Sequence, residues 1–188
     1  MMSLHRQTCF WNEDVFFLRI LCILGRVCII TKMQTRYAKV KDVPAVHALI
    51  SSYAELDRML FRSLADIYEN LQVFQVAEVN DRVIGCCALK VIWSDLAEIQ
   101  SLAIDKNYSG KGYGRNLVLS CVEKARELGI QKVFTLTMEP SFFEKIGFNR
   151  VEKKALPMKV WSDCARCPKQ NQCDEVALII ETNPKAPF

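Results

Sequence analysis

A cluster of glycines and basic residues stands at 108–115, where the sequence reads Tyr-Ser-Gly-Lys-Gly-Tyr-Gly-Arg. The apolar segment 97–104 before it is typical of a buried strand, and 116–128 after it has the spacing of an amphipathic helix. Such a turn directs unpaired first-turn N–H groups outward, where the helix dipole adds partial positive charge. Glycines allow close approach of an anion, and Lys111 and Arg115 add formal charge. The sequence therefore predicts an anion-binding turn.

Spacing excludes two common phosphate-binding motifs at this turn. The phosphate loop of nucleotide hydrolases, G-x-x-x-x-G-K-[ST], occurs in no window of the chain. The dinucleotide fingerprint G-x-G-x-x-G fails because, counting from Gly110, Arg115 stands at the third glycine. A solvated strand–helix turn without a ligand remains open at this point, so the flanking segments must decide.

Length and composition bound the possible functions. The 188 residues are enough for one domain with a proper core, and 51% hydrophobic and 24% charged residues are ordinary for a globular protein. The net charge of +4, with both signs interspersed, calls for neither a nucleic-acid nor a membrane partner. Residues 1–32 are apolar but interrupted by Arg19 and Arg26, which makes a membrane span costly. We expect 1–32 to be a disordered or non-native extension of a single domain at 33–188.

The chain predicts a mixed α/β domain with alternating strands and helices. Because a helical crossover joins the strands at 97–104 and 132–138, these two should lie parallel, while the hairpin strands should be antiparallel. Asp42 is the expected N-cap of the first helix, and the helix after the glycines should bury Leu128 among its apolar residues. The expected strands are 35–40, 74–79, 82–93, 97–104, 132–138, 148–152 and 175–181, and the expected helices begin at 42, 63, 116 and 140.

Two motifs resemble the GNAT superfamily of N-acetyltransferases. Gly112 and Gly114 fall on its R/Q-x-x-G-x-G/A loop, although Ser109 stands where the family usually has Arg or Gln. The stretch 142–148, Phe-Phe-Glu-Lys-Ile-Gly-Phe, is similar to the family's F-Y-x-K-x-G-F ending. The resemblance implies a mixed, mostly antiparallel sheet of six or seven strands, with helices on both faces and a splayed parallel pair of central strands.

The resemblance also implies acetyl-CoA as co-substrate, with no metal required. Its expected contacts are Leu102, Ala103, Ile104, Ser109, Gly110, Lys111, Gly112, Tyr113, Gly114, Arg115, Phe142 and Phe143. Glu98 matches the catalytic glutamate of some members and would act as general base, the alternative being a salt bridge near the sheet surface. Phe143 replaces the family's usual Tyr general acid, a loss that the acidity of a departing thiol tolerates.

The acceptor is suggested by two further segments. Residues 62–71 and 156–161 look like short, stand-alone bacterial amino-acid N-acetyltransferases, similar to the N-acetylglutamate synthases of arginine biosynthesis. A dicarboxylate acceptor needs cations, which Arg58, Arg62 and Lys159 could supply. Acidic Glu55 and Asp57 keep another small amine open, a protein N-terminus is a further possibility, and a lapsed acetyl-CoA-binding regulatory module is a third reading. A homodimer is neither required nor excluded.

The nine cysteines fall into different classes. Cys86, Cys87 and Cys121 lie in apolar segments and are expected to be buried small hydrophobes in the reducing cytosol, since no credible secretion signal is present. Within an insert at 161–174, three cysteines leave zinc open, although a structural site normally has four ligands. A reduced loop or an adventitious disulfide is the alternative. These three are Cys164, Cys167 and Cys173.

Overall fold

The computed structural model describes residues 33–157 and 173–182, which all belong to one compact unit, Met33–Phe188. The expected extension at 1–32 and most of the cysteine insert lie outside the described residues, as do Lys159, Cys164 and Cys167. The strands are β1 (Met33–Tyr37), β2 (Phe74–Val79), β3 (Arg82–Trp93), β4 (Leu96–Ile104), β5 (Lys132–Thr137), β6 (Asn149–Val151) and β7 (Val176–Glu181). The helices are α1 (Val43–Ala54), α2 (Leu64–Glu69), α3 (Tyr113–Glu127) and α4 (Pro140–Glu144).

The strands form one seven-stranded sheet in the order β1-β2-β3-β4-β5-β7-β6. Every neighbouring pair is antiparallel except β4 and β5, which run parallel because α3 crosses over between them. The mixed sheet and its parallel central pair are confirmed as the sequence predicts them. A tight turn joins β2 to β3, with positive φ at Asn80 (50°) and Asp81 (59°), as a two-residue hairpin requires.

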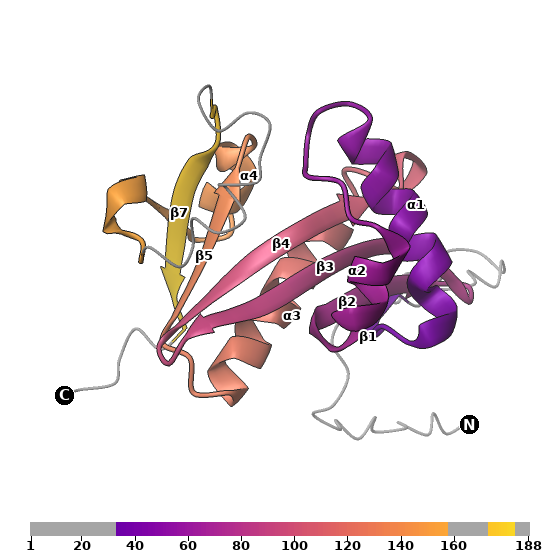
Figure 1. Cartoon of the computed structure of the whole chain (residues 1–188), viewed down its shortest axis with the longest axis horizontal. Coiled ribbons are helices and arrows are strands. Elements are labelled where there is room, and N and C mark those ends of the chain that lie inside the picture. The colour runs from indigo at the N-terminus through magenta and orange to yellow at the C-terminus, as the bar shows by residue number, and fades with distance from the viewer. Residues whose placement is uncertain (1–32, 158–172, 183–188) are drawn as a thin grey trace, which may run out of the picture. The chain divides into compact units, whose positions relative to one another are not determined.

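Helices cover both faces of the sheet, also as predicted (Figure 1). On one face, Val46 and Ile50 of α1 and Ile67 of α2 pack with Val76 and Cys86. On the other face, α3 and α4 pack against alternate residues of the same strands. The buried side chains of this second core include Leu117, Val118, Cys121, Val122 and Ala125 of α3, Phe143 of α4, and Ala77, Ile84, Cys87 and Leu89 of the sheet.

The three cysteines expected inside the core are buried. Burial raises the pKa of the Cys86 thiol to about 12, and Cys87 and Cys121 lie with their sulfur atoms 3.6 Å apart between β3 and α3. These thiols therefore act as small apolar side chains, as the sequence indicates.

Two expectations about α3 need correction. The helix begins at Tyr113 and not at Asn116. Gly112, the N-cap, adopts the left-handed conformation (φ +86°), and the helical backbone starts at the next residue. Leu128 is 52% exposed and not buried, since the helix ends at Glu127 and Gly129 turns the chain away with φ +75°. Gly114 and Arg115 thereby belong to the first turn of the helix.

Asp42 holds the position of N-cap of α1, but its carboxylate does not cap that helix as expected. It accepts from Arg36 Nη1 at 2.6 Å, from Arg36 Nη2 at 3.1 Å and from the Lys39 N–H at 2.7 Å. Arg36 also pairs with Glu78 of β2. The part-buried cluster of Arg36, Asp42 and Glu78 thus joins β1, β2 and the start of α1. Hydrogen bonding from Arg36 is the main cause that lowers the pKa of Asp42.

A carboxylate whose pKa is lower in the folded than in the unfolded chain stabilises the fold above its unfolded pKa, and this contribution is lost as the pH falls through the folded pKa. We therefore expect Asp42→Asn to lower the free energy of unfolding by about 1.5–3 kcal/mol at pH 7. The difference from wild type should narrow below about pH 4. Urea unfolding across pH measures it. Glu127→Gln, which breaks an exposed i,i+3 pair, is the control and should cost less than about 0.5 kcal/mol. A difference for Asp42→Asn that stays constant down to acid pH contradicts the assignment.

Candidate active site

The parallel strands β4 and β5 separate part-way along their length. They are paired only at Leu96–Lys132, Ala97–Val133 and Glu98–Phe134, although they continue to Ile104 and Thr137 (Figure 1). We call the region beyond Glu98 and Phe134 the β4–β5 divergence. At its narrow end the buried Thr135 hydroxyl donates to the Ile99 carbonyl at 3.1 Å, replacing a strand hydrogen bond. The splayed central pair is therefore present, and Glu98 lies at its apex.

The edge of β4 that lines the divergence contains a bulge. Ser101 has φ +52°, and Gln100 and Ala103 pair with Ala88 and Cys86 on β3, so one extra residue is accommodated between them. At the far end the Tyr53 hydroxyl of α1 donates to the Ile104 carbonyl at 3.0 Å and accepts from its N–H at 3.4 Å. Tyr53 thus fixes the end of β4 beside the bulge.

Glu98 is buried, with 8% of its surface exposed, and its carboxylate accepts from Gln100 Nε2 at 2.5 Å. The side-chain amide oxygen of Gln100, Oε1, in turn accepts from Arg62 Nη2 at 3.0 Å, so the Gln100 side chain links Arg62 to Glu98. Lys90 lies directly across from Glu98 in the β3–β4 register. The sequence did not predict Gln100, although a polar residue two positions after Glu98 on a strand must share its face.

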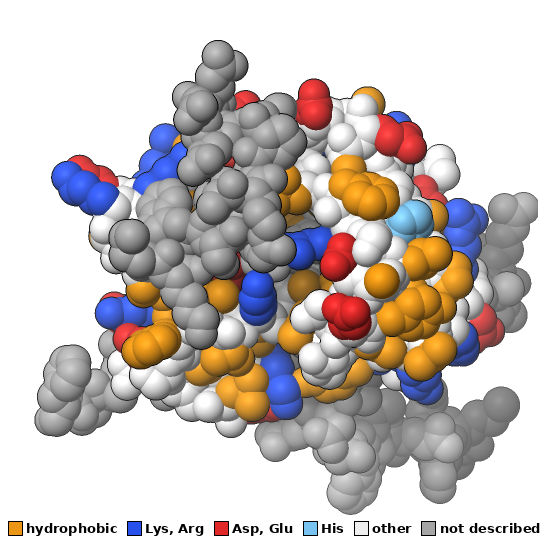
Figure 2. Space-filling model, viewed as in Figure 1, with side chains coloured by type: hydrophobic (Ala, Val, Ile, Leu, Met, Phe, Trp, Pro, Cys, Tyr) orange, Lys and Arg blue, Asp and Glu red, His pale blue; other side chains and the backbone are white. Residues whose placement is uncertain are grey.

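Arg58, the other predicted acceptor cation described here, makes different contacts. It pairs with Glu139, which lies between β5 and α4, and its guanidinium lies 6.0 Å from the centre of the Tyr53 ring. The pair therefore joins the loop after α1 to the chain beyond β5, on the other side of the divergence from β4. Glu55 and Asp57 are exposed on the same loop. Figure 2 shows side chains of both charges around a hollow on this face, beside a hydrophobic patch.

The glycine turn is open toward solvent. Gly110 and Gly112 have φ of +73° and +86°, and a Cβ at either position would meet no atom within 4 Å. The Asn116 N–H bonds the Gly112 carbonyl at 3.1 Å, so the N–H groups just before it belong to the first turn, which has no intrahelical acceptors. Lys111 and Arg115 are exposed on this turn, with Lys111 Nζ bonded to the Asn107 carbonyl at 3.0 Å. The turn has the shape and charge that a phosphate group requires.

Phe142 connects this turn to the rest of the site. A Cβ at Gly114 would lie 3.4 Å from Phe142 Cζ and 3.6 Å from Ile104 Cγ1, so α3, α4 and the end of β4 meet here. Phe143 is buried in the core, edge-on to Phe142 and Phe148 at 5.0 and 5.3 Å between ring centres. Phe142 thus packs against the start of α3. Phe143, at the position where the family usually has a Tyr, packs in the hydrophobic core.

The structure leaves the zinc question where the sequence left it. Within residues 33–157 and 173–182, no group of three or more His, Cys, Asp or Glu side chains could hold a metal ion. Cys173, the described member of the three cysteines, is exposed with its sulfur 3.1 Å from Lys153 Nζ. In the described part of the chain, no helix is both long and apolar enough to cross a membrane.

Residues 43–148 match the Acetyltransferase (GNAT) family. The chain belongs to this family. It is 40% identical over 144 residues to an uncharacterized N-acetyltransferase of Chlorobaculum tepidum, covering 77% of this chain and 93% of the relative. It is also 40% identical over 134 residues to an amino-acid acetyltransferase of Mycobacterium tuberculosis, covering 70% of this chain and 76% of the relative.

Solved structures show the same fold with CoA present. A Mycobacterium tuberculosis protein in complex with CoA is 34% identical with a TM-score of 0.70, over 79% of this chain and 98% of that one. N-acetylglutamate synthase from Neisseria gonorrhoeae, complexed with coenzyme A and N-acetyl-glutamate, is 28% identical with a TM-score of 0.74. That match covers 80% of this chain but 35% of the synthase, so this chain spans about a third of it. The GNAT fold predicted from the two motifs is confirmed.

Proposed function

We propose that this GNAT protein transfers the acetyl group of acetyl-CoA to the α-amino group of an amino acid, with L-glutamate as the expected acceptor. The observation that carries the proposal is the position of Glu98, buried at the apex of the β4–β5 divergence and tied through Gln100 to Arg62. Relatives named amino-acid acetyltransferase support the acceptor class. The N-acetylglutamate synthase structure supports glutamate and a place in arginine biosynthesis.

The donor is proposed to lie along β4 with its pyrophosphate at the glycine turn. First-turn N–H groups of α3, together with Lys111 and Arg115, would hold the phosphates, because Ser109 is too short to replace the usual Arg or Gln there. The pantetheine arm would follow Leu102 and Ala103 along the unpaired edge of β4. Acetyl-CoA, when bound, supplies a thioester carbonyl carbon as the acetyl donor.

The residues of the site are suited to the proton transfers that this reaction needs. An α-amino group has a pKa of about 7.7–8.0, so a carboxylate such as Glu98 can accept its proton directly or through water. A backbone N–H of the bulged β4 edge would stabilise negative charge on the carbonyl oxygen. No acid is required at Phe143, since a thiol of pKa about 8.5 leaves as thiolate.

Two cations are proposed to select a dicarboxylate. Arg62 already lies beside Gln100 and Glu98, where it could bind the α-carboxylate of an amino acid whose amine faces Glu98. Arg58 would exchange Glu139 for the second carboxylate of the acceptor, and Lys159 is a further candidate. The competing enzyme function is acetylation of a different small amine or of a protein N-terminus. The exposed carboxylates of Glu55 and Asp57 favour it, because they would attract a cationic acceptor. The third possibility is a regulatory module that binds acetyl-CoA without catalysis. Ser109 and Phe143 favour it, because they replace the Arg or Gln and the Tyr that the family usually has.

One assay separates these functions. Thiol release from acetyl-CoA is measured with a panel of amino acids, polyamines and peptides at equal concentration. We expect glutamate to give the highest kcat/KM, because two carboxylates can pair with two arginines. A polyamine or a peptide as best acceptor refutes glutamate, and tight CoA binding without turnover for any acceptor refutes the enzyme.

Replacing the proposed base tests the mechanism. Glu98→Gln keeps the size and one hydrogen-bond acceptor but cannot take a proton, so kcat should fall by about 10²–10⁴ with CoA affinity retained. Glu123→Gln is the matched control, since Glu123 is exposed on α3 and pairs with Arg126. Full turnover by Glu98→Gln between pH 7 and 8 would rule out this role.

Two glycines that flank α3 provide a second matched pair. Gly112 and Gly129 both have positive φ with free space for a Cβ, so alanine at either should lower the free energy of unfolding by about 1–2 kcal/mol through backbone strain alone. Gly112 lies at the proposed phosphate turn and Gly129 at the opposite end of the helix. Titration with CoA should therefore show weaker binding for Gly112→Ala and unchanged binding for Gly129→Ala. Equal affinities would place the phosphates elsewhere.

A further inference from the structure

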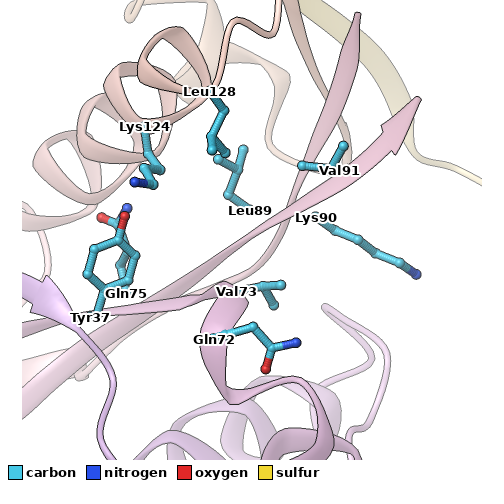
Figure 3. Close-up of a pocket in the computed structure, with 9 residues that line it drawn as sticks. All are labelled: Tyr37, Gln72, Val73, Gln75, Leu89, Lys90, Val91, Lys124 and Leu128. Carbon is cyan, nitrogen blue, oxygen red and sulfur yellow. The ribbon is translucent and has the colours of Figure 1, made fainter. Parts of the chain in front are cut away.

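A cavity of about 290 Å³ lies on the α3 face of the sheet, and no residue of the β4–β5 divergence lines it (Figure 3). Its floor is formed by Tyr37 of β1, Gln75 of β2 and Leu89 of β3, and one wall is the C-terminal end of α3. The glycine turn lies at the other end of this helix, about 22 Å away for 15 residues. The size is at the lower end of ligand-binding pockets.

Gln75 is the unusual residue of this cavity. Its side chain is 4% exposed, and its carboxamide oxygen has no hydrogen-bond partner within the part of the chain that the structure describes. A buried acceptor left without a donor is costly, and native structures rarely leave one unexplained. Tyr37 lies opposite Gln75 in the β1–β2 register, so the amide is held at the edge of the sheet. The oxygen itself is covered, so a ligand carrying a donor would satisfy it after the Gln75 carboxamide rotates toward the cavity.

A cation lines the same side of the cavity as Gln75 (Figure 3). The Lys124 ammonium lies 5.4 Å from the centre of the Tyr37 ring and 3.1 Å from a Glu127 carboxylate oxygen. A hydrogen bond to the Tyr37 hydroxyl, followed by the Glu127 contact, raises the pKa of Lys124, so it stays charged at neutral pH. Figure 3 shows Tyr37, Gln75 and Lys124 on one side of the cavity. This side of the cavity therefore carries an ammonium that can pair with an anion and a carboxamide oxygen that can accept a hydrogen bond.

The other side of the cavity is apolar. Leu89 lies at the floor, while Val91 and Leu128 are each 52% exposed at the edge, so a ligand resting on them would remove apolar surface from water. A ligand for this cavity thus has a small polar head with an anion and a donor, and an apolar tail.

We propose that the cavity is a second binding site, for an α-amino acid with an apolar side chain such as leucine or phenylalanine. The carboxylate would pair with Lys124, which it would share with Glu127, and the α-ammonium would donate to the Gln75 carboxamide oxygen. The side chain would cover Leu89, Val91 and Leu128. This site does not depend on the acceptor proposed above, because it shares none of the proposed donor or acceptor residues.

Calorimetric titration of the full chain with phenylalanine and leucine, in the presence of saturating CoA, tests the proposal. We expect binding that Gln75→Leu and Lys124→Met each weaken at least about fivefold. Lys41→Met, a change of the same kind on the exposed first turn near α1, should leave it unchanged. Thermal melting checks that Gln75→Leu folds, which removal of an unpaired acceptor favours.

Analogues separate the contributions of the head group. The α-hydroxy acid of leucine keeps a donor and should bind, whereas the α-keto acid lacks one and should bind at least about fivefold more weakly. Glu98→Gln should bind the amino acids as wild type does. No binding at about 10 mM overturns the proposal. Two other results would also overturn the proposal. One is binding that neither Gln75→Leu nor Lys124→Met weakens. The other is binding that glutamate displaces only when Glu98 and Arg62 are intact, because the amino acid would then occupy the proposed acceptor site.

Discussion

The structure depends on a parallel strand pair that stops pairing. β4 and β5 are hydrogen-bonded partners over three registered residues and then separate, although backbone groups in a protein interior require partners. Two side chains satisfy the ends of the exposed edge: Thr135 bonds Ile99 and the Tyr53 hydroxyl bonds Ile104. Between these points no residue of β5 pairs with β4, and this is the edge along which we propose that acetyl-CoA binds.

The elements around the divergence hold it open. α3 makes the crossover that forces β4 and β5 to be parallel, and its first turn brings the glycines beside Ile104 and Phe142. The bulge at Ser101 changes which residues of β4 face each side, so that Ile99 and Ile104 pack toward α3 while Ala103 packs toward α1. Glu98 precedes the bulge and stays at the apex. One backbone arrangement therefore provides both the glycine turn, where we propose that the phosphates bind, and the buried carboxylate of Glu98.

Local sequence patterns predicted the elements because their causes are local. Alternation predicted β2 and a long apolar run predicted β3, both with the observed ends, and a capping box of Ser63 with Asp66 starts α2 where a helix is expected. Where a longer-range contact competes, prediction failed: Asp42 pairs with Arg36 of β1 instead of capping α1. Spacing places Gln100 on the face of Glu98, but its contact with Arg62 and the contact of Tyr53 with Ile104 join residues 38 and 51 positions apart, which no local pattern indicates. The burial of Phe143 in the hydrophobic core accounts for a phenylalanine at the position where the family usually has a tyrosine.

We propose that the unpaired edge of β4 and the first turn of α3 form one acetyl-CoA site. Amide hydrogen exchange with and without CoA measures this directly, residue by residue. We expect amide hydrogen exchange to slow at 100–104 and 112–116 when CoA binds, and to stay unchanged in the hairpin at Asn80–Asp81. Unchanged exchange at both segments, with protection appearing elsewhere in the chain, would contradict it.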